Sequence, residues 1–152
     1  MDEKKRPGGL TALAVINFLF AGLSIIGIIG MVFTMNMSGN IPTDGMPEAQ
    51  KAQIAALQSI DPSTFAVTIG ISAVLLILLL LSGIGYLQQK RVLGRIIGNI
   101  YAFFGIISVL ISVLILPKEI GGGFGVSAII GLVYPALTLV LLDTVFKNDL
   151  DN

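Results

Sequence analysis

Residues 62–87 read PSTFAVTIGISAVLLILLLLSGIGYL and contain no charged side chain. Within this stretch every position from Leu75 to Leu81 is leucine or isoleucine. About 20 apolar residues in helical form cross the hydrocarbon core of a bilayer, so the stretch predicts a membrane-spanning helix. Asp61-Pro62 matches an N-cap followed by proline at the first helical position, which predicts where that helix begins. Because its middle has no polar face, we expect this span to be the most lipid-exposed one.

Three further stretches without charge predict spans at about 10–35, 92–116 and 126–146. The chain has 152 residues, of which 55% are hydrophobic and 12% charged, whereas soluble proteins carry about 25% charged residues. Its mean hydropathy is +0.94. The sequence therefore predicts an all-α membrane protein, a four-transmembrane-helix bundle forming a single membrane domain over residues 1–152. No polar stretch is long enough for a separate soluble catalytic domain.

The basic residues predict the orientation. When the loops are assigned to alternate sides, two basic residues, Lys51 and Lys118, lie on one side of the four spans. The other side carries Lys4, Lys5, Arg6, Lys90, Arg91, Arg95 and Lys147. Because basic loops stay inside, both termini are expected in the cytoplasm, and the chain is expected to be a multi-pass protein of the bacterial cytoplasmic membrane.

The loops between the spans differ in length. The first outer loop covers residues 36–61, and its segment 47–60 predicts a short amphipathic helix with Ile54, Leu57 and Ile60 on one side. On the inner side, the turn at 88–91 is so short that it predicts an antiparallel hairpin of the second and third spans.

The composition excludes several kinds of chemistry. The chain has no cysteine and no histidine, so it has no thiolate nucleophile, no disulfide, no structural zinc site and no histidine general base. Its formal net charge is zero, so it does not present the strongly basic surface of a nucleic-acid-binding protein. We expect no catalytic residue, no metal site and no cofactor, and the sequence indicates no cofactor-binding residue.

The third span has the clearest pattern of small residues. They recur at helical spacing, and the opposite side of the helix is filled by large apolar residues. Ladders of this kind mark close helix packing in membranes, with the partner either inside the bundle or on another chain. The residues expected to pack are Gly94, Gly98, Ala102, Gly105 and Ser112.

Two amides lie deepest within the predicted spans, Asn17 and Asn99. Each lies about 10 Å from the inner end of its span at ~1.5 Å per residue, so we expect them to share a depth and to hydrogen-bond. Such a bond between helices contributes about 0.6 kcal/mol and at most about 2 kcal/mol. The alternative is a polar contact for a partner subunit, a quinone or a lipid headgroup. Asp143 and Lys147 are expected to form a surface ion pair at i, i+4.

The stretches RPGGLTALA at 6–14 and GYLQQKRVLGR at 85–95, together with the four-span layout, resemble small four-helix membrane proteins found widely in bacteria. The resemblance implies the architecture and no activity. Tetraspanin- and claudin-like proteins share the topology, but the cysteines of their outer loops are missing here.

The expected function is therefore non-enzymatic. The chain would act as an accessory, assembly or structural subunit of a larger membrane complex, or as a self-associating scaffold. Its partners would be membrane lipid and other membrane subunits or further copies of itself. The alternative is an oligomeric channel or small-solute facilitator lined by the hydroxyls of Ser108, Ser112, Ser127 and Thr138. An enzyme acting on lipids would normally show clustered carboxylates, which this sequence lacks.

Overall fold

The computed structural model describes residues 7–37, 42–116, 118 and 123–150. These residues form helices and loops with no strand among them, and four of the helical segments are long and apolar enough to cross a membrane. This confirms the expected all-α fold with four candidate spans. The helices are α1 (Gly8–Met37), α2 (Glu48–Gln58), α3 (Pro62–Gln88), η1 (Arg91–Ile96), α4 (Ile97–Ile115), α5 (Val126–Val140) and η3 (Leu141–Val145).

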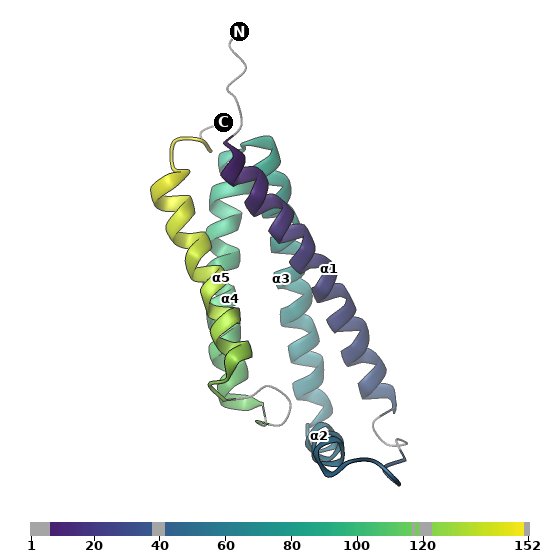
Figure 1. Ribbon diagram of the computed structural model, residues 1–152. Helices are drawn as coiled ribbons and strands as arrows, with labels where there is room; N and C mark the ends of the chain where they lie inside the picture. The colour runs from purple at the N-terminus through teal and green to yellow at the C-terminus, as the bar shows by residue number, and fades with distance from the viewer. Residues whose placement is uncertain (1–6, 38–41, 117, 119–122, 151–152) are drawn as a thin grey trace.

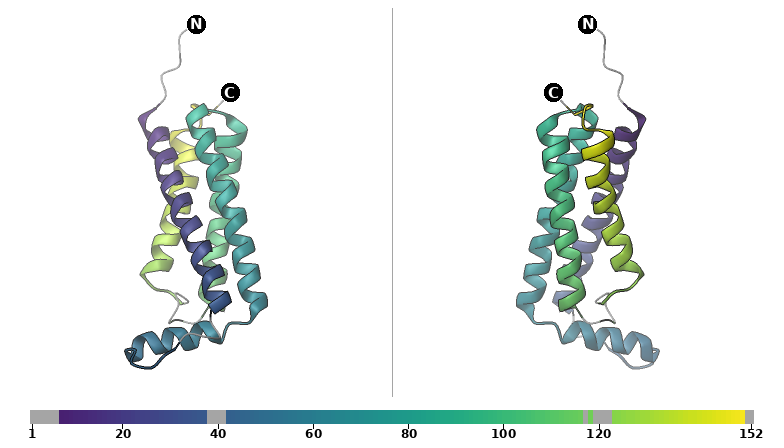
Figure 2. Two further views of the ribbon diagram at one scale, coloured as in Figure 1. Left: turned by 90° about the vertical axis from the view of Figure 1, so that its right-hand side faces the viewer. Right: turned by 90° about the vertical axis from the view of Figure 1, so that its left-hand side faces the viewer.

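The four long segments run up and down as neighbours, with α1 beside α3 and α4 beside α5 (Figures 1 and 2). Both ends of the chain lie at the same end of the bundle, which we call the terminal end. The short helix α2 lies across the opposite end, the α2 end, and its bounds fall within the predicted segment 47–60. From their tight turn at the terminal end, α3 and α4 diverge toward the α2 end (Figure 1). The basic residues Lys4, Lys5 and Arg6 lie outside the described residues.

Local sequence explains the ends of α3. Asp61 caps its N-terminus by accepting a hydrogen bond from the backbone N–H of Ser63 at 3.1 Å, and Pro62 occupies the first turn, as expected. At the other end Gln89 adopts a left-handed conformation with φ of 53°, and the N–H of Lys90 donates to the carbonyl of Gly85 at 3.1 Å. This compact turn starts the return of the chain along α4.

The α3–α4 hairpin requires glycine at its closest point. A Cβ atom on Gly85 would overlap the main chain of Leu93 and Gly94, which has no flexible side chain to move aside. The pattern Ser82-Gly83-Ile84-Gly85 at the end of the second span therefore serves close backbone packing.

The buried core lies mainly toward the terminal end. One cluster of buried side chains closes that end: Leu10, Leu13, Ala14, Tyr86, Leu142, Phe146 and Leu150. A second cluster follows below it: Ala21, Leu79, Tyr101 and Ala102. In the most apolar 18-residue stretch of α3, 11% of the residues are buried, against 22% to 28% in the corresponding stretches of the other three candidate spans. This confirms that α3 is the most exposed of the four spans.

The C-terminal segment contributes two side chains to the first cluster. This contribution was not predicted from the sequence. Phe146 packs over the position of Gly9, and Leu150 is fully buried beside Gly94. Phe146 and Leu150 are two large apolar residues among polar neighbours, and this was the signal that the segment packs on the bundle.

Candidate functional site

The small residues of the third span pack inside this chain. Gly94, Gly98, Ala102 and Gly105 are all buried, whereas the opposite face of α4 is exposed, with Leu114 at 83%. A Cβ on Gly98 would meet Tyr86 and Leu142, and one on Gly105 would lie 3.2 Å from the ring of Pro135. The sequence left open whether this face packs inside the bundle or against another chain. The structure places α3 and α5 of the same chain against this part of the face. Ser112, farther toward the α2 end, is half-buried.

Asn17 lies at the centre of a buried polar network. Its side chain is fully buried, and its Nδ2 donates to the Oγ of Ser82 at 2.7 Å and to the carbonyl of Leu79 at 3.3 Å. Its Oδ1 accepts a hydrogen bond from the hydroxyl of Tyr134. One amide thus links α1, α3 and α5. All of its polar atoms are directed to other helices, which is the role of an interhelical hydrogen bond.

The expected pairing of Asn17 with Asn99 is wrong. The Nδ2 of Asn99 instead donates to both carboxylate oxygens of Asp143, each at 3.2 Å. Equal depth in the membrane does not determine which way a side chain points around its helix. Asn17 points toward α3 and α5, whereas Asn99 points toward the end of the last span.

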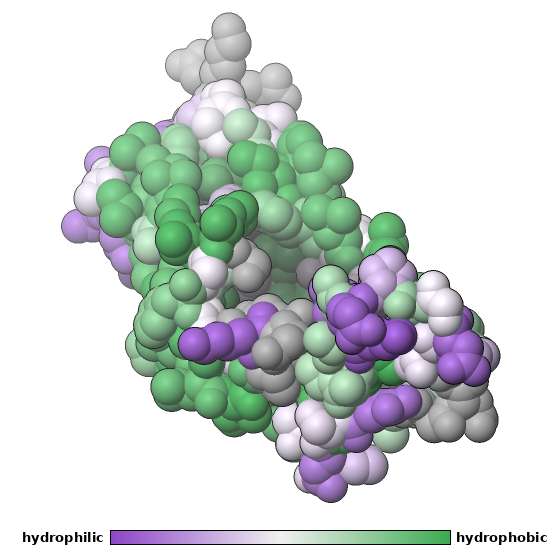
Figure 3. All heavy atoms as spheres, turned by 60° about the horizontal axis from the view of Figure 1, so that its bottom comes forward, coloured by the Kyte–Doolittle hydropathy of each residue, from purple (hydrophilic) through white to green (hydrophobic). Residues whose placement is uncertain are grey.

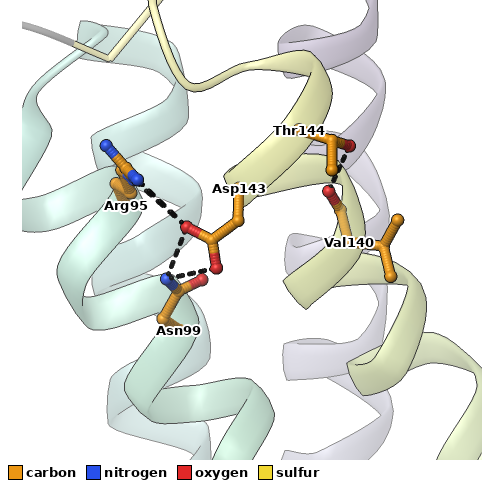
Figure 4. A network of polar contacts seen from close by, with 5 residues as sticks. All are labelled: Arg95, Asn99, Val140, Asp143 and Thr144. Atoms are coloured by element: carbon orange, nitrogen blue, oxygen red, sulfur yellow. Dashed lines mark hydrogen bonds and ion pairs between the residues drawn. The ribbon is translucent and has the colours of Figure 1, made fainter.

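Asp143 is the centre of a second polar cluster, at the terminal end (Figure 4). Besides Asn99, its Oδ1 accepts from the Nε and Nη2 of Arg95 at 3.3 and 3.2 Å. The Arg95 side chain is 23% exposed and that of Asp143 46%, so the ion pair is partly desolvated. Arg95 and Asn99 are one turn apart on the third span and together hold one carboxylate of the fourth.

This cluster replaces the ion pair expected between Asp143 and Lys147. The fourth span ends in the π-helical segment η3 at Val145, so Lys147 lies beyond the last helical residue and is exposed. The N–H of Phe146 donates to the carbonyl of Leu141 at 2.9 Å, five residues back. The wider turn and the early end remove the i, i+4 relationship on which the expected pair rested.

Both charged members of the cluster stand on π-helical segments. Arg95 belongs to η1 and Asp143 to η3, and the two segments face each other across the ion pair. Isolated π turns inside helices commonly occur at functional positions, because the extra residue changes the direction of the side chains that follow. The sequence offered one signal for this site: opposite charges at the inner ends of two predicted spans.

Two cavities separate the helix pairs toward the α2 end. One, of about 210 Å³, is lined by residues of α1, α3, α4 and α5, among them Gly105 and Tyr134. The other, of about 270 Å³, lies between α3 and α4 with Met31 of α1, and it includes Ser112. Ser108 belongs to the walls of both. Figure 3, which brings the α2 end forward, shows a hollow with mainly hydrophobic walls bordered by hydrophilic side chains.

Three hydroxyl groups in or near these cavities bond to their own helices. The Oγ of Ser112 donates to the carbonyl of Ser108 at 2.9 Å, and Thr138 and Thr68 make the same bond four residues back, at 2.9 and 2.8 Å. Hydroxyls in this arrangement satisfy their hydrogen without leaving the helix. The side chain of Ser127 lies outside the described part of the structure.

The described residues contain no group of three or more acidic side chains that could hold a metal ion. The chain matches no protein-family model, no curated protein and no solved structure. Its architecture and its polar contacts are therefore the observations on which a function can be argued.

Proposed function

We propose that this chain is a non-enzymatic protein of the bacterial inner membrane that serves as an accessory, assembly or structural subunit of a larger membrane complex, or as a self-associating scaffold. Its termini would be cytoplasmic and α2 would lie at the outer surface. The proposal is supported by the polar side chains within the spans, which form hydrogen bonds between helices of the same chain. Ser82 and Tyr134 each bond to Asn17, and Arg95 and Asn99 each bond to Asp143.

Because these two groups of polar side chains bond within the chain, we infer that the chain acts through its surface. That surface is apolar over most of the long helices, with large side chains exposed on every span. In a membrane such a surface contacts lipid or the helices of neighbouring proteins, where packing and a few polar contacts decide association. The small-residue face of α4 supports bundle packing, so a partner would bind elsewhere, on the exposed sides of α1, α4 and α5.

The second candidate is an oligomeric channel or small-solute facilitator. The observation that favours it is the cavity between α3 and α4, whose walls include six hydroxyl side chains. Within one chain, the cluster around Tyr86, Leu142 and Leu150 fills the terminal end, so a pore would require an axis between copies.

Purification from native membranes in nanodiscs, followed by native mass determination, separates these candidates. We expect the chain to migrate with foreign subunits at fixed stoichiometry, or as a defined homo-oligomer without conductance in planar bilayers. Steady conductance by the pure homo-oligomer would support the channel instead. A strictly monomeric chain without protein partners would contradict the subunit and scaffold roles together.

A further inference from the structure

We infer that the crevice between the helix pairs binds one acyl chain of a membrane phospholipid, with an amine-bearing headgroup such as ethanolamine held at the α2 end. The inference goes beyond the proposed function and holds whether or not the chain assembles with other proteins. It rests on three cavities that adjoin one another and change in polarity from the α2 end inward.

The polar member of the series lies at the α2 end. It measures about 260 Å³ and is lined partly by Ser59 and Asp61, just before α3 begins. Thr64 and Leu116 belong both to this cavity and to the 270 Å³ cavity between α3 and α4. That cavity in turn meets the deepest one at Ser108. Each of the three cavities thus shares lining residues with the next.

The deeper walls suit a hydrocarbon chain. The innermost cavity is lined by apolar and aromatic side chains with a few hydroxyls, and the two inner cavities have no charged side chain in their described walls. Thr64 and Leu79 mark the two ends of the series on α3, fifteen residues apart, a rise of about 22 Å at ~1.5 Å per residue. One leaflet of the hydrocarbon core is about 15 Å thick, so the crevice is long enough for one acyl chain.

The mouth of the crevice selects the headgroup. Among the described residues that line the three cavities, Asp61 carries the one charge, a carboxylate. Its Oδ2 accepts from Ser63 at the helix cap, which leaves Oδ1 for a further donor. A carboxylate attracts an ammonium group and repels a headgroup with net negative charge. Phosphatidylethanolamine, whose headgroup ends in an ammonium group, therefore fits this mouth, and phosphatidylglycerol, which has a net negative charge and no amine, does not.

The test measures lipid retained by the full-length protein. The chain is reconstituted in nanodiscs of equal parts phosphatidylethanolamine and phosphatidylglycerol, then extracted in mild detergent, and the lipid retained per chain is identified by native mass spectrometry. We expect one phosphatidylethanolamine per wild-type chain. Ser108→Leu, which fills the junction of the inner cavities, is expected to lose it. Leu114→Phe, on the exposed face of the same helix, is the matched control and should retain it.

A second variant tests the headgroup separately. Asp61→Asn keeps an equally good N-cap and removes the charge, so it is expected to retain one lipid but to lose the preference for ethanolamine over glycerol. Retention of the same lipid by Ser108→Leu would overturn the site, as would a wild-type preference for the anionic lipid. Subunit composition is measured separately, on the native-membrane preparation, so failure of the lipid site is distinguishable from failure of the proposed function.

Discussion

At the scale of single residues, Asn17 is the buried amide that joins three helices. Removing its amide leaves the hydroxyl of Tyr134 without an acceptor in an apolar interior, which costs free energy of folding. Replacing both partners by apolar groups removes that cost. Asn17→Leu keeps a similar side-chain volume and is expected to lower the free energy of unfolding by about 1–3 kcal/mol. The measurement is unfolding in detergent micelles titrated with a denaturing detergent.

Two further variants distinguish hydrogen bonding from packing. The double variant Asn17→Leu with Tyr134→Phe should recover part of the loss, because neither polar partner then remains. Asn36→Leu is the matched control, since Asn36 is exposed and bonds to the carbonyl of Val32 in its own helix. Equal losses for the single and double variants would mean that Asn17 acts through its shape alone.

At the scale of helices, the ion pair between η1 and η3 fixes how the third and fourth spans meet. A double-mutant cycle with Arg95→Gln and Asp143→Asn is expected to give a coupling energy of up to about 1 kcal/mol, since the pair is partly exposed. The parallel cycle with Lys147→Gln and Asp143→Asn should give a coupling energy close to zero. A larger coupling for Lys147 than for Arg95 would contradict the arrangement in Figure 4.

The helices also show where sequence reasoning works and where it stops. Uncharged length predicted four spans to within a few residues of the observed ends, and small-residue spacing predicted the buried face of α4. Asn17 makes hydrogen bonds between helices, as the sequence predicted, although its partners are Ser82, Leu79 and Tyr134 instead of Asn99. The partner of Asn99 was not predictable, since the direction of Asp143 depends on the π-helical turn of η3, which hydrophobic periodicity does not reveal.

At the scale of the whole molecule, the expected orientation can be tested with single cysteines, because the natural chain has none. Asp44, just before α2, and Lys147, just after η3, are both exposed, and these two segments lie at opposite ends of the bundle, so each residue can be replaced by cysteine. In intact spheroplasts, a membrane-impermeant maleimide should label Asp44→Cys at once and Lys147→Cys after permeabilisation. Labelling in the reverse order would place both termini outside the cell and overturn the orientation derived from the basic residues.

The uneven distribution of contacts along the bundle has a mechanical consequence. The side-chain hydrogen bonds described above that join different spans lie at the terminal end or near the middle, and the cavities lie toward the other end. We therefore expect the bundle to be stiffer at the terminal end than at the α2 end. A change in the lateral pressure of the bilayer should first alter the separation of α3 and α4 beside α2, while the ion pair at the far surface stays intact.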